Sequence, residues 1–189
     1  DKVIEGSEYS SVTIDDFRVS YQMVQHLYKS GSRNIVGVFG KTGLTITHQR
    51  FNGFSQALKD LGLRNSESHT QFVNNSQEGK DKTIQLLKKH KPDGLYLMTD
   101  EIMLGALPAI SELGISVPKQ LGVIAISDGI LPHFMIPKIS HMKHDGFELG
   151  SLGTQKLIQY INAKNNNILW RNVEKVVMNT NIVLLESTK

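Results

Sequence analysis

The stretch Val36–Gly43, "VGVFGKTG", ends a short apolar run with Gly40-Lys41-Thr42, which could be the end of a nucleotide phosphate loop. Such a loop has a first glycine five positions before the glycine of Gly-Lys-Ser/Thr, because that first glycine opens a curve of backbone N–H groups around the phosphates. Here the required position holds Ile35, and Gly37 lies too close. The pattern favours an ordinary strand exit with a solvated Lys41. A nucleotide-using enzyme remains the weaker alternative.

Polar side chains also follow other apolar runs. Thr99 and Asp100 end one run, and Ser127 and Asp128 end another. Arg50 lies in the first turn of a predicted helix whose N-terminus faces the same edge. Guanidinium, hydroxyl and carboxylate groups that converge on one cleft suit a polyhydroxylated ligand, since such a group can hydrogen-bond to two neighbouring hydroxyl groups at once. Taken singly, each has a simpler explanation: a surface charge for Arg50, a helix cap for Asp100 and a turn for Ser127-Asp128.

The inventory of catalytic and metal-binding residues is thin. The chain of 189 residues has no cysteine, which excludes disulfides and thiolate chemistry. It contains neither His-Glu-x-x-His nor Gly-x-Ser-x-Gly. His141 and His144 share one predicted strand region but have no third ligand nearby in sequence. We therefore expect no metal, no cofactor and no enzymatic activity.

The overall charge and hydropathy exclude two further classes of partner. The net charge is +3, and the basic residues are dispersed, so the sequence does not predict direct nucleic-acid binding by this chain. Its densest basic run, Leu86–Gly94, is typical of a solvated helix end. No apolar run approaches the ~20 residues that a membrane-spanning helix needs.

Strand-like and helix-like segments alternate along the chain. This alternation predicts an α/β fold with a doubly wound parallel sheet, in which ligands bind beyond the carboxyl ends of the strands. Thr47 is the expected cap of its helix, and Pro108 could kink another. The expected strands are Ser11–Asp15, Asn34–Gly40, His69–Val73, Asp93–Thr99, Leu121–Ser127 and Ile139–His144, with closing segments Glu174–Asn179 and Asn181–Ser187. The expected helices are Phe17–Gly31, Thr47–Gly62, Ser76–His90, Asp100–Gly114 and Phe147–Ala163.

Several motifs, in order over nearly the whole chain, resemble one known family. They are "VTIDD…HLYKSGSRNIVGVFG", "RFNGFSQALKDLGL", "PDGLYLMTDEIMLGALPAISELGISVPKQLGVIAISD" and a closing "LLEST". This series is similar to the effector-binding core of lactose-repressor-family transcription regulators. The resemblance implies a periplasmic-binding-protein-like fold of two α/β subdomains with the ligand between them, preceded by a helix-turn-helix headpiece.

The resemblance also assigns roles to individual positions. Arg50 matches the arginine that grips the sugar, and we expect it to be the strongest single effector contact, with its loss leaving folding nearly intact. Thr99 replaces an asparagine ligand and Ser127 replaces an aspartate, so hydrogen-bonding groups are kept but shortened. Because of these two replacements, a simple galactoside or glucoside is not the obvious effector. The expected effector-binding residues are Arg50, Thr99, Asp100, Ser127, Asp128 and His144, with Leu44 and Ile46 in the cleft wall beside an exposed Lys41.

We expect the chain to form a homodimer. The resemblance and the apolar run "HFMIP" place Leu104, Met135 and Ile136 in the interface. The alternative is that this run is tucked into the core.

The resemblance divides the chain into four parts. Residues 1–13 form the tail of the first subdomain, 14–144 the second subdomain, 145–165 a helix returning to the first subdomain, and 166–189 the closing strands of the second. The second subdomain is then nearly complete, while most of the first, and the headpiece, would precede Asp1. The helix Phe147–Ala163 is apolar over a wide arc, so its face should be uncovered in this chain.

The sequence thus predicts the effector-binding and dimerisation region of a cytoplasmic, ligand-responsive transcription regulator, a repressor by its family. Its effector would be a sugar, a sugar phosphate or a purine, and operator DNA would be bound through the headpiece. A secreted sugar-binding protein of the same fold is the first alternative.

Overall fold

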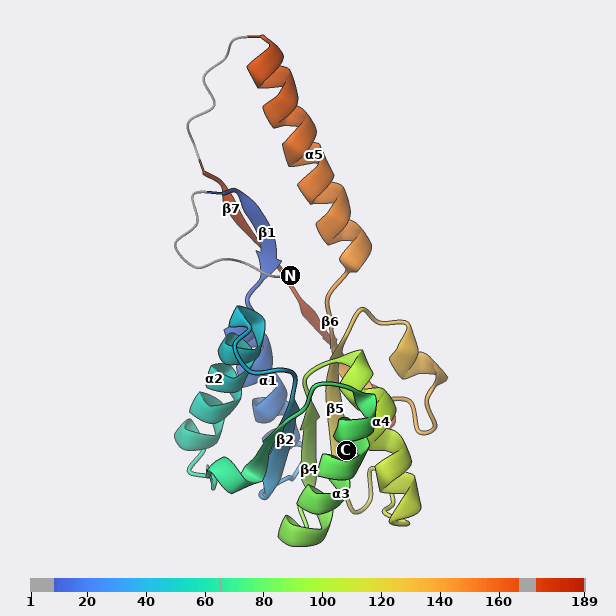
Figure 1. Ribbon diagram of the computed structural model, residues 1–189. Coiled ribbons are helices and arrows are strands. Elements are labelled where there is room, and N and C mark those ends of the chain that lie inside the picture. The colour runs from blue at the N-terminus through green and yellow to red at the C-terminus, as the bar shows by residue number, and fades with distance from the viewer. Residues whose placement is uncertain (1–8, 65, 167–172, 189) are drawn as a thin grey trace.

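A six-stranded sheet organises most of the chain. The computed structural model describes residues 9–64, 66–166 and 173–188 of the 189. The strands lie in the order β3-β2-β4-β5-β6-β8 (Figure 1). All neighbours are parallel except β8, which runs antiparallel to β6. The strands are β2 (Ile35–Phe39), β3 (Thr70–Phe72), β4 (Gly94–Leu97), β5 (Gly122–Ser127), β6 (Ser140–Lys143) and β8 (Asn181–Val183).

Two pairs of helices cover this sheet. Every residue of β2, β4 and β5 is buried, as expected for strands covered on both faces. Helix α1 packs on α2, and α3 packs on α4. Because crossovers between parallel strands are right-handed, α2 lies on one face and the α3–α4 pair on the other (Figure 1). The predicted doubly wound α/β fold is therefore confirmed. The helices are α1 (Asp16–Lys29), α2 (Thr45–Asp60), α3 (Ser76–His90) and α4 (Asp100–Glu112).

Both helix pairs meet at a glycine. A Cβ atom at Gly53 of α2 would stand 2.1 Å from the carbonyl oxygen of Phe17 in α1. A Cβ atom at Gly105 of α4 would stand 2.0 Å from the carbonyl oxygen of Ser76 in α3. Only glycine permits such approaches. The contact at Gly53 brings the first turn of α1, including Asp16, against the N-terminal half of α2.

One local expectation was wrong, and two alternatives raised by the sequence can be narrowed. Helix α2 begins at Thr45 with Leu44 at its N-cap, so Thr47 does not cap it but lies buried in its first turn. Helix α4 is capped by Thr99, whose hydroxyl accepts a hydrogen bond from the backbone N–H of Ile102 at 3.3 Å, so Asp100 is not the cap. The same helix continues past Pro108 to Glu112, so Pro108 does not end it.

A second, smaller sheet lies apart from the first. It consists of β1 (Ser11–Ile14) and β7 (Lys175–Met178), which pair in parallel. Helix α5 (Gly146–Asn165) contacts β1 and projects away from the large sheet (Figure 1). The structure thus divides the segment expected to close the second subdomain, since β7 joins the small sheet and β8 the large one. Residues 1–8, 167–172 and 189 of the expected divisions lie outside the described residues.

Helix α5 carries an uncovered apolar face. Ala163 is its one residue in the buried class, whereas Phe147 is 84% exposed. Leu157, Ile158, Tyr160 and Ile161 are also exposed. This exposure confirms the expectation drawn from its wide apolar arc. Among the described residues, no helix combines the length and apolar character that crossing a membrane requires.

Candidate functional site

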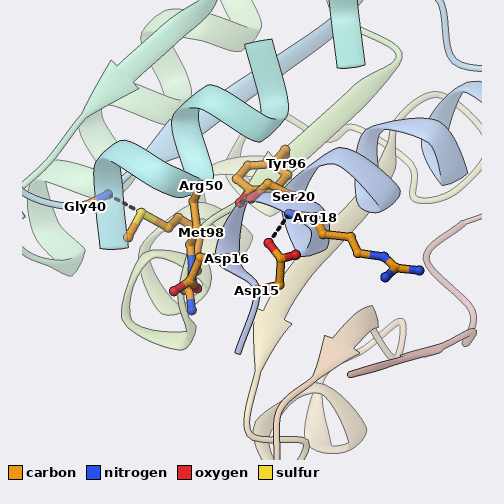
Figure 2. A network of polar contacts seen from close by, with 8 residues as sticks. All are labelled: Asp15, Asp16, Arg18, Ser20, Gly40, Arg50, Tyr96 and Met98. Atoms are coloured by element: carbon orange, nitrogen blue, oxygen red, sulfur yellow. Dashed lines mark hydrogen bonds and ion pairs between the residues drawn. The ribbon is translucent and has the colours of Figure 1, made fainter. Parts of the chain in front are cut away.

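Arg50 is buried at the carboxyl edge of the large sheet. Its side chain is only 4% exposed, which rules out the surface-charge explanation. Its Nε donates a hydrogen bond to Oδ1 of Asp16 at 2.7 Å, and Nη1 donates to the carbonyl oxygen of Met98 at 2.8 Å (Figure 2). A guanidinium group has five N–H donors, and these two contacts hold it in one orientation while other donors stay available.

A second group of ionisable side chains surrounds His144, just after β6. The charge of Arg50 and those of Asp16, Asp100 and Asp128 all act on this imidazole. Burial, followed by the positive charge of Arg50, lowers the pKa of His144, so the ring is neutral near pH 7. Burial raises the pKa of Asp100, and hydrogen bonding to Ser127 offsets part of that effect. The structure therefore brings Arg50, Asp100, Ser127, Asp128 and His144 into one neighbourhood.

Ser127 and Asp128 also form a turn. Oγ of Ser127 accepts from the backbone N–H of Gly129 at 3.0 Å, and Oδ1 of Asp128 accepts from that of Ile130 at 3.2 Å. The turn that the sequence offered as the simpler explanation for Ser127-Asp128 is therefore present. Ser127 is buried and Asp128 exposed, and the turn leaves the charge of Asp128 close to Asp100 and His144.

Two cavities share Ile46: Arg50 lines the smaller one, and Met98, whose carbonyl group Arg50 contacts, lines the larger one. The larger, of about 270 Å³, is bordered by Leu44, Lys41 and Thr99. Lys41 is exposed and contributes to this wall, as the sequence predicts. The smaller cavity lies where β1 and α5 approach the large sheet. It is lined by Thr13, Ile14, Asp16, Thr45, Ile46, Gln49, Arg50, His144 and Leu149.

Sequence reasoning missed several residues of these walls. Thr47, Asn74 and Met98 line the larger cavity, and Asp16 lines the smaller one. Asn74 and Asn75 directly follow the apolar end of β3, so the rule that located Thr99 and Ser127 could have found them. Asp16 carried no such signal, because it begins a helix rather than ending a strand.

Some buried polar atoms of this region lack protein partners. Among the described residues, Oγ1 of Thr47, Oδ1 of Asp100 and Nδ1 of His144 make no hydrogen bond. A buried polar atom without a partner costs roughly 1–3 kcal/mol. His144 shares the smaller cavity with Arg50, Thr47 lines the larger one, and Asp100 lines neither. Arg50 and His144 together suit a ligand that both donates and accepts hydrogen bonds. Within the described part of the chain, no group of three or more histidine, aspartate and glutamate side chains could hold a metal ion.

The residues expected in a dimer interface lie on the surface to different degrees. Leu104 on α4 is 50% exposed and Ile136 is 100% exposed. Met135 is partly buried and packs against the core. The segment is therefore partly tucked in, with Phe134 and Ile136 left outside.

Fold and site together define a ligand-binding α/β domain of the periplasmic-binding-protein class. A family model described as a periplasmic binding protein-like domain matches residues 24–188. The chain belongs to this family, and curated relatives that it matches are named as transcriptional regulators, in agreement with the sequence resemblance.

Individual relatives agree with this assignment. The transcriptional regulator RegA of Clostridium acetobutylicum is 30% identical over 188 residues, which cover 98% of this chain and 55% of RegA. The chain thus spans about half the length of the curated relatives it matches. The structure of CcpA of Lactococcus lactis has a TM-score of 0.85 at 19% identity, over 100% of this chain and 68% of CcpA. The structure of a lactose-repressor-family regulator of Enterococcus faecium with bound ribose has a TM-score of 0.84 at 23% identity, and the match covers 98% of this chain and 67% of that protein.

The buried position of Arg50 changes the expected effect of its loss. Arg50→Ala would leave Asp16 and the Met98 carbonyl without their partner, so we expect a drop of about 3 kcal/mol in the free energy of unfolding. Lys41→Ala, at an exposed site in the same cleft wall, should change it by less than about 0.5 kcal/mol. Urea unfolding of both variants measures the difference. Equal stability of the two would show that the buried pair contributes nothing.

Proposed function

We propose that this chain is the effector-binding and dimerisation region of a cytoplasmic bacterial transcription regulator, most simply a repressor. The effector is a sugar, a sugar phosphate or a purine, and operator DNA is bound through a separate headpiece. The observation that carries this proposal is the oriented guanidinium of Arg50 beside buried, unpartnered polar atoms at the carboxyl edge of the sheet. The names of the relatives, and the ribose in one of them, support it.

The smaller cavity provides a mechanism for the response. Its walls come from the large sheet through Arg50 and His144, and from the other part of the molecule through Thr13 of β1 and Leu149 of α5. The chain crosses between the two parts three times: directly before Asp16, directly after His144, and between β7 and β8. A ligand that contacts both parts favours their closed arrangement and so resets the spacing of the DNA headpieces in a dimer. Effector-binding roles are thereby proposed for Arg50, Thr99, Asp100, Ser127, Asp128, His144, Leu44 and Ile46.

A thermal-shift screen of sugars, sugar phosphates and purines on the intact protein tests the effector. A ligand at 100 times its Kd should add about 2.7 kcal/mol to the free energy of unfolding. Arg50→Lys keeps the charge but not the planar fork of donors, so it should weaken binding by about 1.5–3 kcal/mol. Lys59→Ala, at an exposed position that lines neither cavity, is the control and should bind as the parent does. A ligand that Arg50→Lys binds with unchanged affinity would place the site elsewhere.

We also propose a homodimer through α4 and the segment after β5, with Leu104, Met135 and Ile136 as contacts. Exposed leucine and isoleucine side chains on adjoining segments are typical of such interfaces. Leu104→Glu should shift the intact protein to monomer in sedimentation velocity. Lys59→Glu, which adds a carboxylate to α2 on the other face of the sheet, should leave the dimer unchanged. A dimer that survives Leu104→Glu would rule this interface out.

The exposed face of α5 belongs, in this proposal, to the first effector subdomain. Leu152–Ile161 would pack there against chain that precedes the large sheet in the full regulator. Backbone amides of this stretch should then exchange hydrogen much faster in the isolated 189-residue chain than in the intact protein, because protection follows packing. Amides of β5, which is buried in both, serve as the internal reference. Equal protection of α5 in both samples would contradict this placement.

A further inference from the structure

The pairing of Arg50 with Asp16 sets the charge of the site before any ligand arrives. The two side chains are 4% and 16% exposed, and Nε and Oδ1 are 2.7 Å apart. Figure 2 shows the carboxylate of Asp16 lying directly against the guanidinium, whereas Asp15 turns toward Arg18. A buried ion pair presents little net charge to its surroundings. Arg50 therefore reaches the cleft as an oriented hydrogen-bond donor rather than as a free cation.

The remaining ionisable groups near Arg50 add negative charge. Asp100 and Asp128 act on His144 together with the Arg50–Asp16 pair, while the imidazole itself is neutral near pH 7. Asp16 thus contacts the guanidinium directly, and two further carboxylates, those of Asp100 and Asp128, act on the neighbouring His144. Lys41 is exposed at the rim of the larger cavity, and Lys143 is exposed and paired with Asp145 at 3.3 Å. Asp100 is half-buried and Asp128 is exposed, so the carboxylates in this neighbourhood outnumber the single guanidinium even if Asp100 binds a proton.

We propose that Asp16 determines the charge selectivity of the effector site. By neutralising Arg50, it makes the site accept uncharged, hydroxyl-rich effectors and reject their phosphorylated counterparts. This inference rests on the proposed function, because it concerns the same site. It narrows the effector classes to those without a phosphate or carboxylate group, and it assigns the selectivity to a residue 34 positions away in sequence from the arginine that contacts the ligand.

Asp16→Asn is a sharp probe of this role. Asparagine has nearly the same shape, and its amide oxygen can still accept the hydrogen bond from Nε of Arg50, so the guanidinium keeps its orientation. Only the negative charge is lost. The positive charge of Arg50 then becomes available to an anion, as in the arginine sites that recognise phosphate elsewhere.

The chain contains a matched control one residue away. Asp15 is exposed and caps α1 by accepting a hydrogen bond from the backbone N–H of Arg18 at 2.9 Å. Asp15→Asn removes the same charge, and asparagine caps helices as well as aspartate does. It changes the net charge of the protein equally but leaves the Arg50–Asp16 pair intact.

Isothermal titration of the intact protein with inorganic phosphate, and with ribose beside ribose 5-phosphate, tests the proposal. Asp16→Asn should bind phosphate about tenfold more tightly than the parent or more, because a like-charge contact has been removed. Asp15→Asn and Asp16→Glu should bind it as weakly as the parent. Asp16→Ser, also neutral, should repeat the gain and serves as the second variant should Asp16→Asn unfold. Phosphate affinity that is the same in the neutral variants and the parent overturns the proposal.

The same titrations separate this inference from the proposed function. A parent protein that binds a neutral sugar, with no gain of phosphate binding in Asp16→Asn, leaves the regulator proposal standing and removes the role of Asp16. A gain of phosphate binding in a protein that no sugar, sugar phosphate or purine stabilises establishes the role of Asp16 and contradicts the effector proposal.

Discussion

A buried guanidinium needs an anionic or carbonyl partner, and this need organises the carboxyl edge of the large sheet. Arg50 of α2 draws its partners from two other segments, the first turn of α1 through Asp16 and the exit of β4 through Met98. The carboxylate can reach it because Gly53 lets the backbone of Phe17 lie against α2. One side chain thereby fixes the relative positions of two helices and a strand end. The cavities on either side of Ile46 take their shape from that arrangement.

The sequence predicted the large sheet because its strands are continuous apolar runs whose ends carry polar residues. Thr99 and Ser127 could be found for this reason, since parallel strands end at a common edge. Asp16 could not, because its partner is set by the packing of α1 on α2. The expected cap at Thr47 was wrong for a similar reason: the N-cap of α2 is Leu44, three residues earlier than the capping pattern indicates, and Thr47 lines the larger cavity instead.

Strand pairing was the least predictable part of the fold. β7 and β8 are short neighbours in sequence, and both have the β-branched residues of strands. Yet β7 pairs with β1, from the other end of the chain, while β8 pairs with β6. The apolar pattern along a strand indicates which of its faces are buried, but it does not say which other strand lies beside it in the sheet. The division of β7 and β8 between the two sheets therefore became visible only in three dimensions.

In the proposed regulator, affinity and response would come from different residues. A ligand shifts a conformational equilibrium only through contacts that differ between the two states. Arg50 is held by Asp16 and Met98 within one part of the molecule, so its contact with a ligand is available in the open and the closed state alike. It would contribute affinity but little coupling. The coupling must come from groups that meet only on closure, and in the smaller cavity these are Thr13 and Leu149 opposite His144, whose Nδ1 still lacks a partner.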